Sequence, residues 1–120
     1  MNRHQTRLSM VFALYQHLLL KKNLDDVFND LDLNDDFIFN IKNDLSNNEE
    51  IYINEINNHL NKWTFDRLSY LDQAILLESF SEIKCNLNNK NIVIDEAIRI
   101  AKEYSDEESY KFINGVLDNL

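Results

Sequence analysis

The chain has 120 residues, which suits one modest hydrophobic core, and we expect residues 1–120 to form a single helical domain. Hydrophobic residues (44%) and aromatic residues (11%) suffice for a folded interior, which argues against wholesale disorder. The sequence has no run of about 18 apolar residues and no signal-peptide pattern, so we expect no membrane association. The single cysteine, Cys85, cannot form an internal disulfide, which suits a cytoplasmic location.

Charge is distributed unevenly along the sequence. Residues 1–22 contain no Asp or Glu and carry +4 from Lys and Arg, whereas the remainder carries −13, which together give the formal net charge of −9. An acidic protein repels a phosphate backbone at long range. The sequence therefore predicts a polarised surface with one small basic region at the start of the chain.

An all-α fold is predicted because the chain has no Pro, one Gly and almost no period-2 alternation. Apolar spacing indicates a compact bundle of about seven helices. In chain order we expect them at residues 3–20, 24–31, 35–45, 49–63, 66–84 and 92–104, with a seventh starting at a capping box in residues 105–108. The fifth should be central because its apolar surface is the widest. Asn residues should supply caps and loops, including residues 86–91.

Two positions within these helices are interpreted as structural. Trp63 follows Ile53, Ile56 and Leu60 at spacings of three and four, so we expect it to close the fourth helix. Gly115 is the only glycine and lies inside a helical pattern, where it costs about 1 kcal/mol relative to Ala. We interpret it as a point of close helix packing.

Motifs of catalysis are missing from the sequence. His4, His17 and His59 are dispersed, and Cys85 has no neighbouring His or second Cys. No HExxH, CxxC, phosphate-loop or GxSxG pattern occurs. We therefore expect no enzyme activity, no catalytic residues, no metal and no cofactor.

Four segments carry motifs that identify a family by resemblance. They are residues 3–16 (RHQTRLSMVFALYQ), 63–76 (WTFDRLSYLDQAIL), 96–102 (EAIRIAK) and 111–117 (KFINGVL). Together and in this order they resemble the NusB transcription antitermination family, and only residues 20–60 match weakly. The resemblance implies a NusB-like fold in which an N-terminal group of helices packs against a C-terminal group.

The start of the chain is a candidate RNA-binding site. Arg3 and Arg7 lie four residues apart and so share one face of a helix, whose N-terminus suits a phosphate. On charge alone, a solvated helix start with two ordinary surface arginines is the favoured interpretation, and the family resemblance reverses that preference. In the resembled family this segment contacts boxA-like single-stranded RNA, and Arg3, His4 and Arg7 match its positions, with His4 where an arginine is usual.

The same resemblance extends the RNA surface from the first helix to the start of the last. Aromatic side chains there could stack on bases, although core positions are the alternative interpretation for each of them. Glu108 stands where an Asp is common. Beyond the N-terminal residues, the predicted RNA-binding residues are Tyr15, Tyr104, Glu108, Lys111 and Phe112.

The resemblance also implies a protein partner, NusE, a small-subunit ribosomal protein that is typically basic. The acidic surface of this chain suits such a partner, although scattered carboxylates can serve solubility alone. Tyr15, Asp66 and Asp72 match the partner-binding positions, whereas Leu77 and Ser81 depart from the family pattern.

The sequence thus predicts an RNA-binding factor that, with NusE, suppresses termination within the RNA polymerase antitermination complex, chiefly on ribosomal RNA operons. One alternative is a NusB-like domain related to those of ribosomal RNA cytosine methyltransferases. Another is an acidic helical protein–protein adaptor without RNA function.

Overall fold

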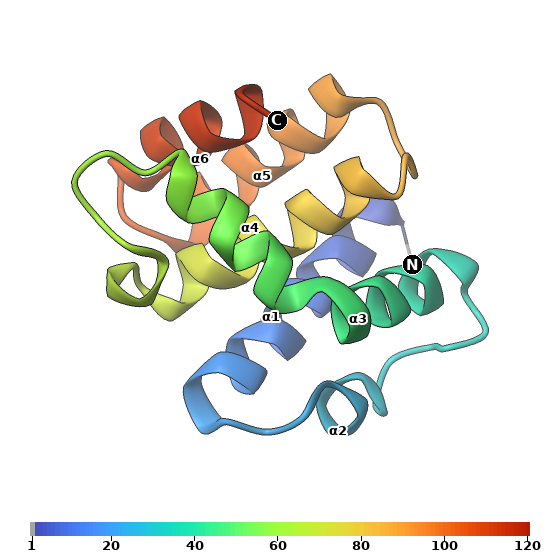
Figure 1. Cartoon of the computed structure of the whole chain (residues 1–120). Helices are drawn as coiled ribbons and strands as arrows, with labels where there is room; N and C mark the ends of the chain where they lie inside the picture. Colours follow the sequence, from blue (N-terminus) through green and yellow to red (C-terminus); the bar gives the residue numbers. More distant parts are fainter. Residues whose placement is uncertain (1) are drawn as a thin grey trace.

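The computed structural model describes residues 2–120, and these residues form helices and connections without any strand (Figure 1). The elements are α1 (Arg3–Leu20), α2 (Leu24–Phe28), α3 (Asp36–Asn58), the 3-10 helix η1 (Phe65–Arg67), α4 (Tyr70–Lys84), α5 (Lys90–Tyr104) and α6 (Ser109–Asp118). The predicted all-α fold is confirmed, with six α-helices among the described residues in place of the expected seven.

Helix α4 is the centre of the fold, as its apolar surface predicts. It packs against α1, α3, α5 and α6, and Asp72 through Glu82 are all buried. Figure 1 shows it in the middle of the bundle, with α5 and α6 on one side and α1 and α3 on the other. Any polar side chain on α4 therefore needs a partner from a neighbouring helix.

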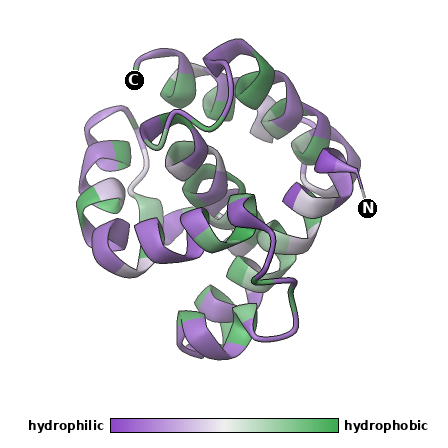
Figure 2. Ribbon diagram, turned by 90° about the vertical axis from the view of Figure 1, so that its right-hand side faces the viewer, coloured by the Kyte–Doolittle hydropathy of each residue, from purple (hydrophilic) through white to green (hydrophobic). Residues whose placement is uncertain are grey.

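One hydrophobic cluster draws on every helix. Its largest fully buried side chains include Phe28 of α2, Phe80 of α4 and Ile113 of α6. Figure 2 shows hydrophobic and hydrophilic residues alternating along each helix, the pattern of helices that bury one face. In the part of the chain that the structure describes, no helix combines the length and apolarity needed to cross a membrane.

Asn side chains begin three of the helices, which confirms their predicted capping role. Asn2, Asn23 and Asn89 are the N-caps of α1, α2 and α5, and each accepts a hydrogen bond from a backbone N–H of the first turn. Asp35 and Ser69 cap α3 and α4 in the same way. These bonds satisfy backbone donors that a helix start leaves unpaired.

The two helices expected at residues 35–45 and 49–63 are one continuous helix, α3. The prediction of a break was wrong because the Asn side chains between them bond to the helix itself. Asn47 and Asn48 each donate to the carbonyl oxygen four residues earlier, at 3.0 Å. They therefore continue the helix instead of capping a new one.

Helix α3 ends earlier than predicted and leaves Trp63 outside any helix. The side-chain oxygen of Asn57 accepts a 2.7 Å hydrogen bond from the backbone N–H of Phe65, which fixes the turn that follows α3. The next α-helix starts at Tyr70, after the short η1. Trp63 is 58% exposed, so the expectation that it closes a helix on the core side was wrong.

The last helix starts at Ser109 and not at the predicted capping box. Ser105 ends α5 in an extended conformation, and its hydroxyl donates to Asp72 of α4 at 2.6 Å. Glu108 is exposed and pairs with Lys111, 2.7 Å away. The predicted capping box does not form, because the Ser105 hydroxyl donates its hydrogen bond to the buried carboxylate of Asp72 instead of capping a helix.

Gly115 lies on the open side of α6. A Cβ built at this position would meet nothing within 4 Å. The expected close packing at this glycine is therefore absent, and the fold itself does not require a glycine here.

Candidate functional site

The start of α1 presents basic groups without acidic neighbours in its first turn. Asn2 and Gln5 form a reciprocal capping box, with Gln5 N–H donating to the Asn2 side chain at 2.9 Å and Asn2 N–H to the Gln5 side chain at 3.3 Å. This arrangement fixes the direction in which the first helical residues project. Arg3, His4 and Arg7 nevertheless lie in three different environments.

Arg3 is the accessible arginine of this segment. Its side chain is 52% exposed, its Nη1 lies 3.2 Å from Asp35 Oδ2, and its guanidinium stacks over the ring of Phe37 at 4.2 Å. A surface ion pair of this kind contributes about 0–1 kcal/mol, so a phosphate can compete for the guanidinium. Arg3 therefore fits the predicted role of a phosphate contact.

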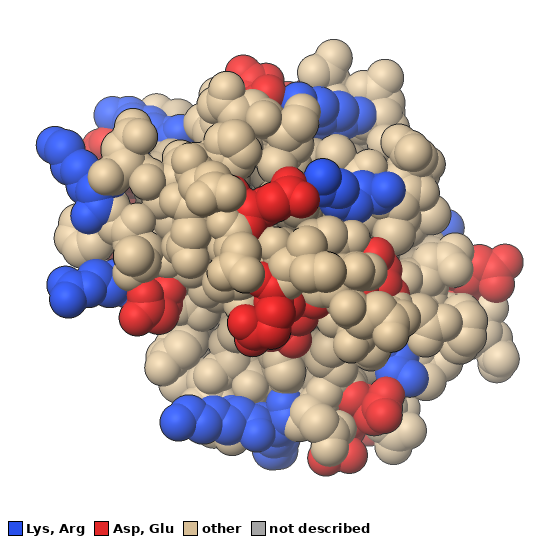
Figure 3. Space-filling model, in the orientation of Figure 1, with Lys and Arg blue, Asp and Glu red and all other residues tan. Residues whose placement is uncertain are grey.

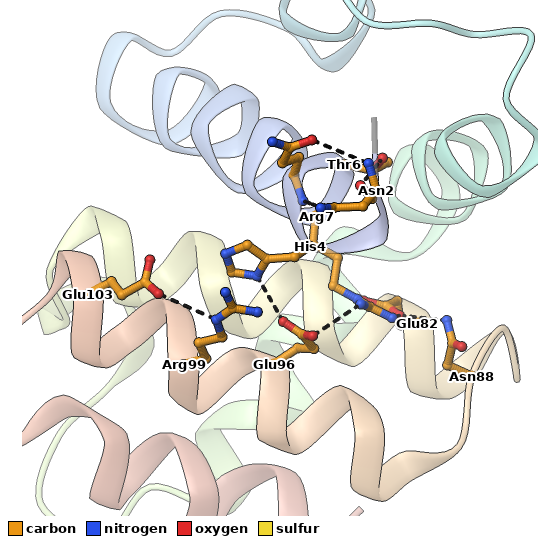
Figure 4. A network of polar contacts seen from close by, with 10 residues as sticks. Asn2, His4, Thr6, Arg7, Glu82, Asn88, Glu96, Arg99 and Glu103 are labelled. Carbon is orange, nitrogen blue, oxygen red and sulfur yellow. Dashed lines mark hydrogen bonds and ion pairs between the residues drawn. The ribbon is translucent and has the colours of Figure 1, made fainter.

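His4 lies beside Arg3 and points to α5. Its Nδ1 is 2.9 Å from Glu96 Oε2, and its side chain is 15% exposed. The contact joins the first turn of α1 to α5, as Figure 4 shows. Because the other ring nitrogen is outside this pair, His4 keeps one polar atom for a ligand.

Arg7 is buried, contrary to the expectation of an exposed helix start. Its Nε donates to Glu82 Oε2 at 2.8 Å, its Nη2 to Glu82 Oε1 at 3.1 Å, and its Nη1 lies 3.9 Å from Glu96 Oε1 (Figure 4). Arg3 and Arg7 both lie near the ring of Phe37, but only Arg7 reaches the carboxylates of α4 and α5. Arg7 therefore holds three helices together and is not open to a phosphate.

A second buried carboxyl group, Glu78, belongs to the same interior region. It lies one turn before Glu82 on α4, and its Oε2 has no hydrogen-bond partner. Burial, and next the charge of Glu82, raise the pKa of Glu78 well above its usual range. No pattern in the sequence pointed to this group, because its burial is created by the helices packed around α4.

An aromatic groove lies where α1, the start of α4 and the end of α5 meet. The rings of Phe12 and Tyr104 pack edge to face, 5.5 Å apart, and both are partly exposed (39% and 46%). Tyr15 and Tyr70 also line this groove, a cavity of about 500 Å³. The structure thus brings together the predicted Tyr15 and Tyr104 with Phe12 and Tyr70, which sequence reasoning missed. Phe12 lies on the apolar stripe of α1, a pattern typical of core positions.

The remaining predicted RNA contacts lie on or just before α6. Lys111 and Glu108 form an exposed ion pair of 2.7 Å, with side chains 61% and 77% exposed. Phe112 is half-buried and packs against the core. None of these three lines the groove of Phe12 and Tyr104.

The two acidic residues predicted to bind a partner differ in exposure. Asp66 is exposed on η1 and accepts a hydrogen bond from the Thr64 hydroxyl. Asp72 is buried, and its carboxylate accepts hydrogen bonds from the hydroxyls of Ser105 (2.6 Å) and Ser109 (2.9 Å). The expected surface position of Asp72 was therefore wrong, because the first turn of α4 lies beneath the connection between α5 and α6.

Comparison with known proteins places this arrangement in a family. A family model described as the NusB family matches residues 4–120. The chain belongs to the NusB family. A transcription antitermination protein NusB of Sulfurovum sp. (strain NBC37-1) is 37% identical over 97% of this chain and 95% of its own length. Another from Staphylococcus carnosus (strain TM300) is 33% identical over 100% of this chain and 99% of its own length.

Solved structures carry the same fold. A structure described as T. maritima NusB superposes with a TM-score of 0.88 at 30% identity, covering 99% of this chain and 89% of that one. A chain from "Crystal Structure of a Plectonemic RNA Supercoil" superposes with a TM-score of 0.82 at 22% identity, covering 98% of this chain and 94% of that one. At that identity the second likeness concerns the fold alone. The motif-based assignment to the NusB family is confirmed.

Proposed function

We propose that this chain is a transcription antitermination factor, as its NusB relatives are named, and that it binds boxA-like single-stranded RNA, as the family resemblance implies. The observation that carries the proposal is that the surface along α1 offers both an accessible cation, Arg3 at its start, and the open aromatic groove of Phe12 and Tyr104 toward its other end. Cations for phosphates and aromatic rings for bases are the two ingredients of single-strand recognition.

The distribution of charge indicates that a second protein assists RNA binding by this chain. Acidic side chains gather over α3 in the middle of the face that Figure 3 shows, and the chain as a whole carries −9. A field of that sign opposes a polyanion at long range. A basic partner such as NusE would neutralise part of it, so we propose that NusE binds this chain and raises its affinity for RNA within the antitermination complex on ribosomal RNA transcripts.

We place the partner contact at Tyr15 and Asp66 and leave out the buried Asp72. Tyr15 lines the aromatic groove, and Asp66 lies exposed on η1, within the connection that leads into the start of α4. An exposed carboxylate suits a basic ribosomal protein. Because transcripts are made in the cytoplasm of a bacterial cell, we propose that the chain acts there.

Fluorescence anisotropy with a labelled boxA-like RNA, at several salt concentrations and with and without NusE, tests the RNA part. Arg3→Ala should weaken binding and flatten the log–log salt slope by about 0.7, the value for one phosphate contact on a single strand. Lys84→Ala, at the far end of α4, is the matched control and should leave the slope unchanged. An unchanged slope with Arg3→Ala would remove the start of α1 from the site.

Calorimetry tests the partner part. Asp66→Lys should weaken NusE binding without weakening RNA binding by the chain alone. Since coupling between two ligands is reciprocal, RNA should tighten NusE binding by the factor by which NusE tightens RNA binding. An acidic adaptor without RNA function would bind NusE and show no RNA binding at any salt concentration.

A further inference from the structure

A second groove lies between the connection that follows α3 and the outer side of α6. His59, Lys62 and Trp63 line it from the connection, and Lys111, Phe112 and Gly115 line it from α6. It has a volume of about 400 Å³. None of the residues that line it is an Asp or Glu, although the chain contains 21 of them.

The charged groups of this groove are positive. Lys62 and Lys111 are exposed, and His59 lies beside them. Lys111 pairs with Glu108, but both side chains are more than half exposed, and a pair of this kind is weak enough to exchange for a phosphate. In Figure 3, Lys and Arg side chains project from the left edge, where Figure 1 shows the connection between α3 and α4.

Trp63 gives the groove an open aromatic surface. At 58% it is the most exposed of the large hydrophobic residues in the described part of the chain. The exposed part of the indole adds no packing to the fold, whereas a nucleic-acid base stacked on it gains affinity.

Gly115 also indicates that the groove binds a ligand. An alanine at this place would meet nothing within 4 Å and would favour the helix by about 1 kcal/mol. Its backbone does not have the positive φ that favours glycine. The fold gains nothing from the missing side chain, but a ligand in the groove gains closer approach to the backbone of α6.

We propose that this groove binds a stretch of single-stranded RNA, with a base stacked on Trp63 and phosphates near Lys62 and Lys111. The proposal rests on the proposed function and extends it, because the two grooves are lined by segments that follow one another closely in the chain. Residues 69–71 and 104–106 line the first groove together with α1, and residues 59–63 and 111–119 line the second. A strand that leaves the ring of Tyr104 can therefore continue along α6 to Trp63.

The only tryptophan of the chain reports on this groove directly. Its fluorescence should be quenched as a boxA-like RNA long enough to span both grooves is added to the chain with NusE. The quenching should follow the anisotropy of the labelled RNA over the same concentrations. The same titration with Trp63→Phe provides the baseline that subtracts any signal from NusE.

Substitutions at Trp63 separate stacking from simple apolar contact. Trp63→Leu removes the aromatic ring and should weaken RNA binding by roughly 5- to 150-fold, the range for one stacked base. Trp63→Phe keeps a ring and should bind within a fewfold of the wild type. If Trp63→Leu and Trp63→Phe weakened the binding of a protein partner equally and left RNA binding unchanged, the groove would belong to that partner. This result would overturn the proposal.

Gly115→Ala tests the groove without disturbing the fold. It should raise the melting temperature and at the same time weaken RNA binding, a combination that a structural role does not produce. Asn114→Ala, the exposed neighbour on α6 that does not line the groove, is the control and should bind RNA as the wild type does.

The result that overturns this inference differs from the one that overturns the proposed function. RNA binding that weakens with Arg3→Ala, but leaves Trp63 fluorescence unchanged and tolerates Trp63→Leu, would overturn only the second groove. Absence of RNA binding in the presence of NusE would overturn both.

Discussion

Arg7 of α1 and Glu82 of α4 form a two-point ion pair in the interior, with N–O distances of 2.8 and 3.1 Å. The side chains are 4% and 0% exposed. Glu96 of α5 lies 3.9 Å from the same guanidinium, so one cation joins three helices. A buried ion pair stabilises a fold little more than apolar residues of similar size would. The loss of one partner is costly, however, because it leaves the other group buried without a counter-charge.

Arg7→Ala should therefore destabilise the protein by about 3–5 kcal/mol, because Glu82 would be left buried without its ion-pair partner. Arg3→Ala removes an arginine from the same side of α1, but its surface ion pair contributes at most about 1 kcal/mol. Urea unfolding followed by circular dichroism measures both. Similar midpoints for the two variants would contradict the structural role of Arg7.

The difference between these two arginines shows what the sequence could predict. The bounds of α1 follow from local features, an Asn cap and an apolar stripe without a breaker, and the predicted residues 3–20 match the helix. The burial of Arg7 depends on Glu82, which lies 75 residues later in the chain. Spacing within one helix does not reveal which part of that helix another helix will cover.

The aromatic residues show the same limit. The family resemblance predicts Tyr15 and Tyr104 as surface contacts, and the structure places both in one groove. Phe12 fits the apolar stripe of α1, a pattern typical of the core, yet it is 39% exposed and packs against Tyr104. Trp63 continues the apolar spacing of α3, but α3 ends before it, because spacing alone does not show where a helix ends. Helix type was thus predictable, whereas helix ends and exposure depended on tertiary contacts.

Asp72 is expected to hold the connection between α5 and α6 in place. Asp72→Ala removes the acceptor of the Ser105 and Ser109 hydroxyls, and hydrogen bonds to a charged group contribute about 1.5–3 kcal/mol. Stability should fall by about that amount, and amide hydrogen exchange should increase first in α6. Asp106→Ala, an exposed carboxylate in the same connection, is the control. Unchanged exchange in α6 with Asp72→Ala would show that these bonds do not hold the helix.

Glu78 should make the protein less stable as the pH rises. Its pKa is raised in the folded state, by burial first and by Glu82 next, so the folded state binds a proton that the unfolded state releases above pH 4.5. Its stabilising contribution is complete below that pH and is lost as the pH rises through the folded-state pKa. Glu78→Gln keeps the shape and stays neutral, so it should match the wild type near pH 4.5 and exceed its stability in alkaline buffer. Parallel curves of unfolding midpoint against pH would contradict this account.

His17 should add a second pH dependence, centred on the turn between α1 and α2. Its Nε2 lies 3.0 Å from both carboxylate oxygens of Glu49, and its Nδ1 faces the backbone carbonyl of Lys22. Both partners accept hydrogen bonds, so both ring nitrogens must donate, which requires the protonated imidazolium.

The protonated form of His17 stabilises the folded state. The hydrogen bond to Glu49 raises the pKa of His17, burial opposes the increase, and the Lys22 carbonyl adds to it. A raised pKa means that the contribution is fully present below pH 6.5 and is lost as the pH rises through the folded-state value. Glu49→Gln should therefore lower the unfolding midpoint in mildly acidic buffer and leave it nearly unchanged in alkaline buffer, where His17 is neutral in both proteins.

The control is Glu50→Gln, the exposed neighbour of Glu49 on α3, which should follow the wild-type curve. An NMR titration of the His17 ring should give a lower pKa in Glu49→Gln than in the wild type. A constant difference between the Glu49→Gln and wild-type midpoints across this range would show that His17 does not carry the charge.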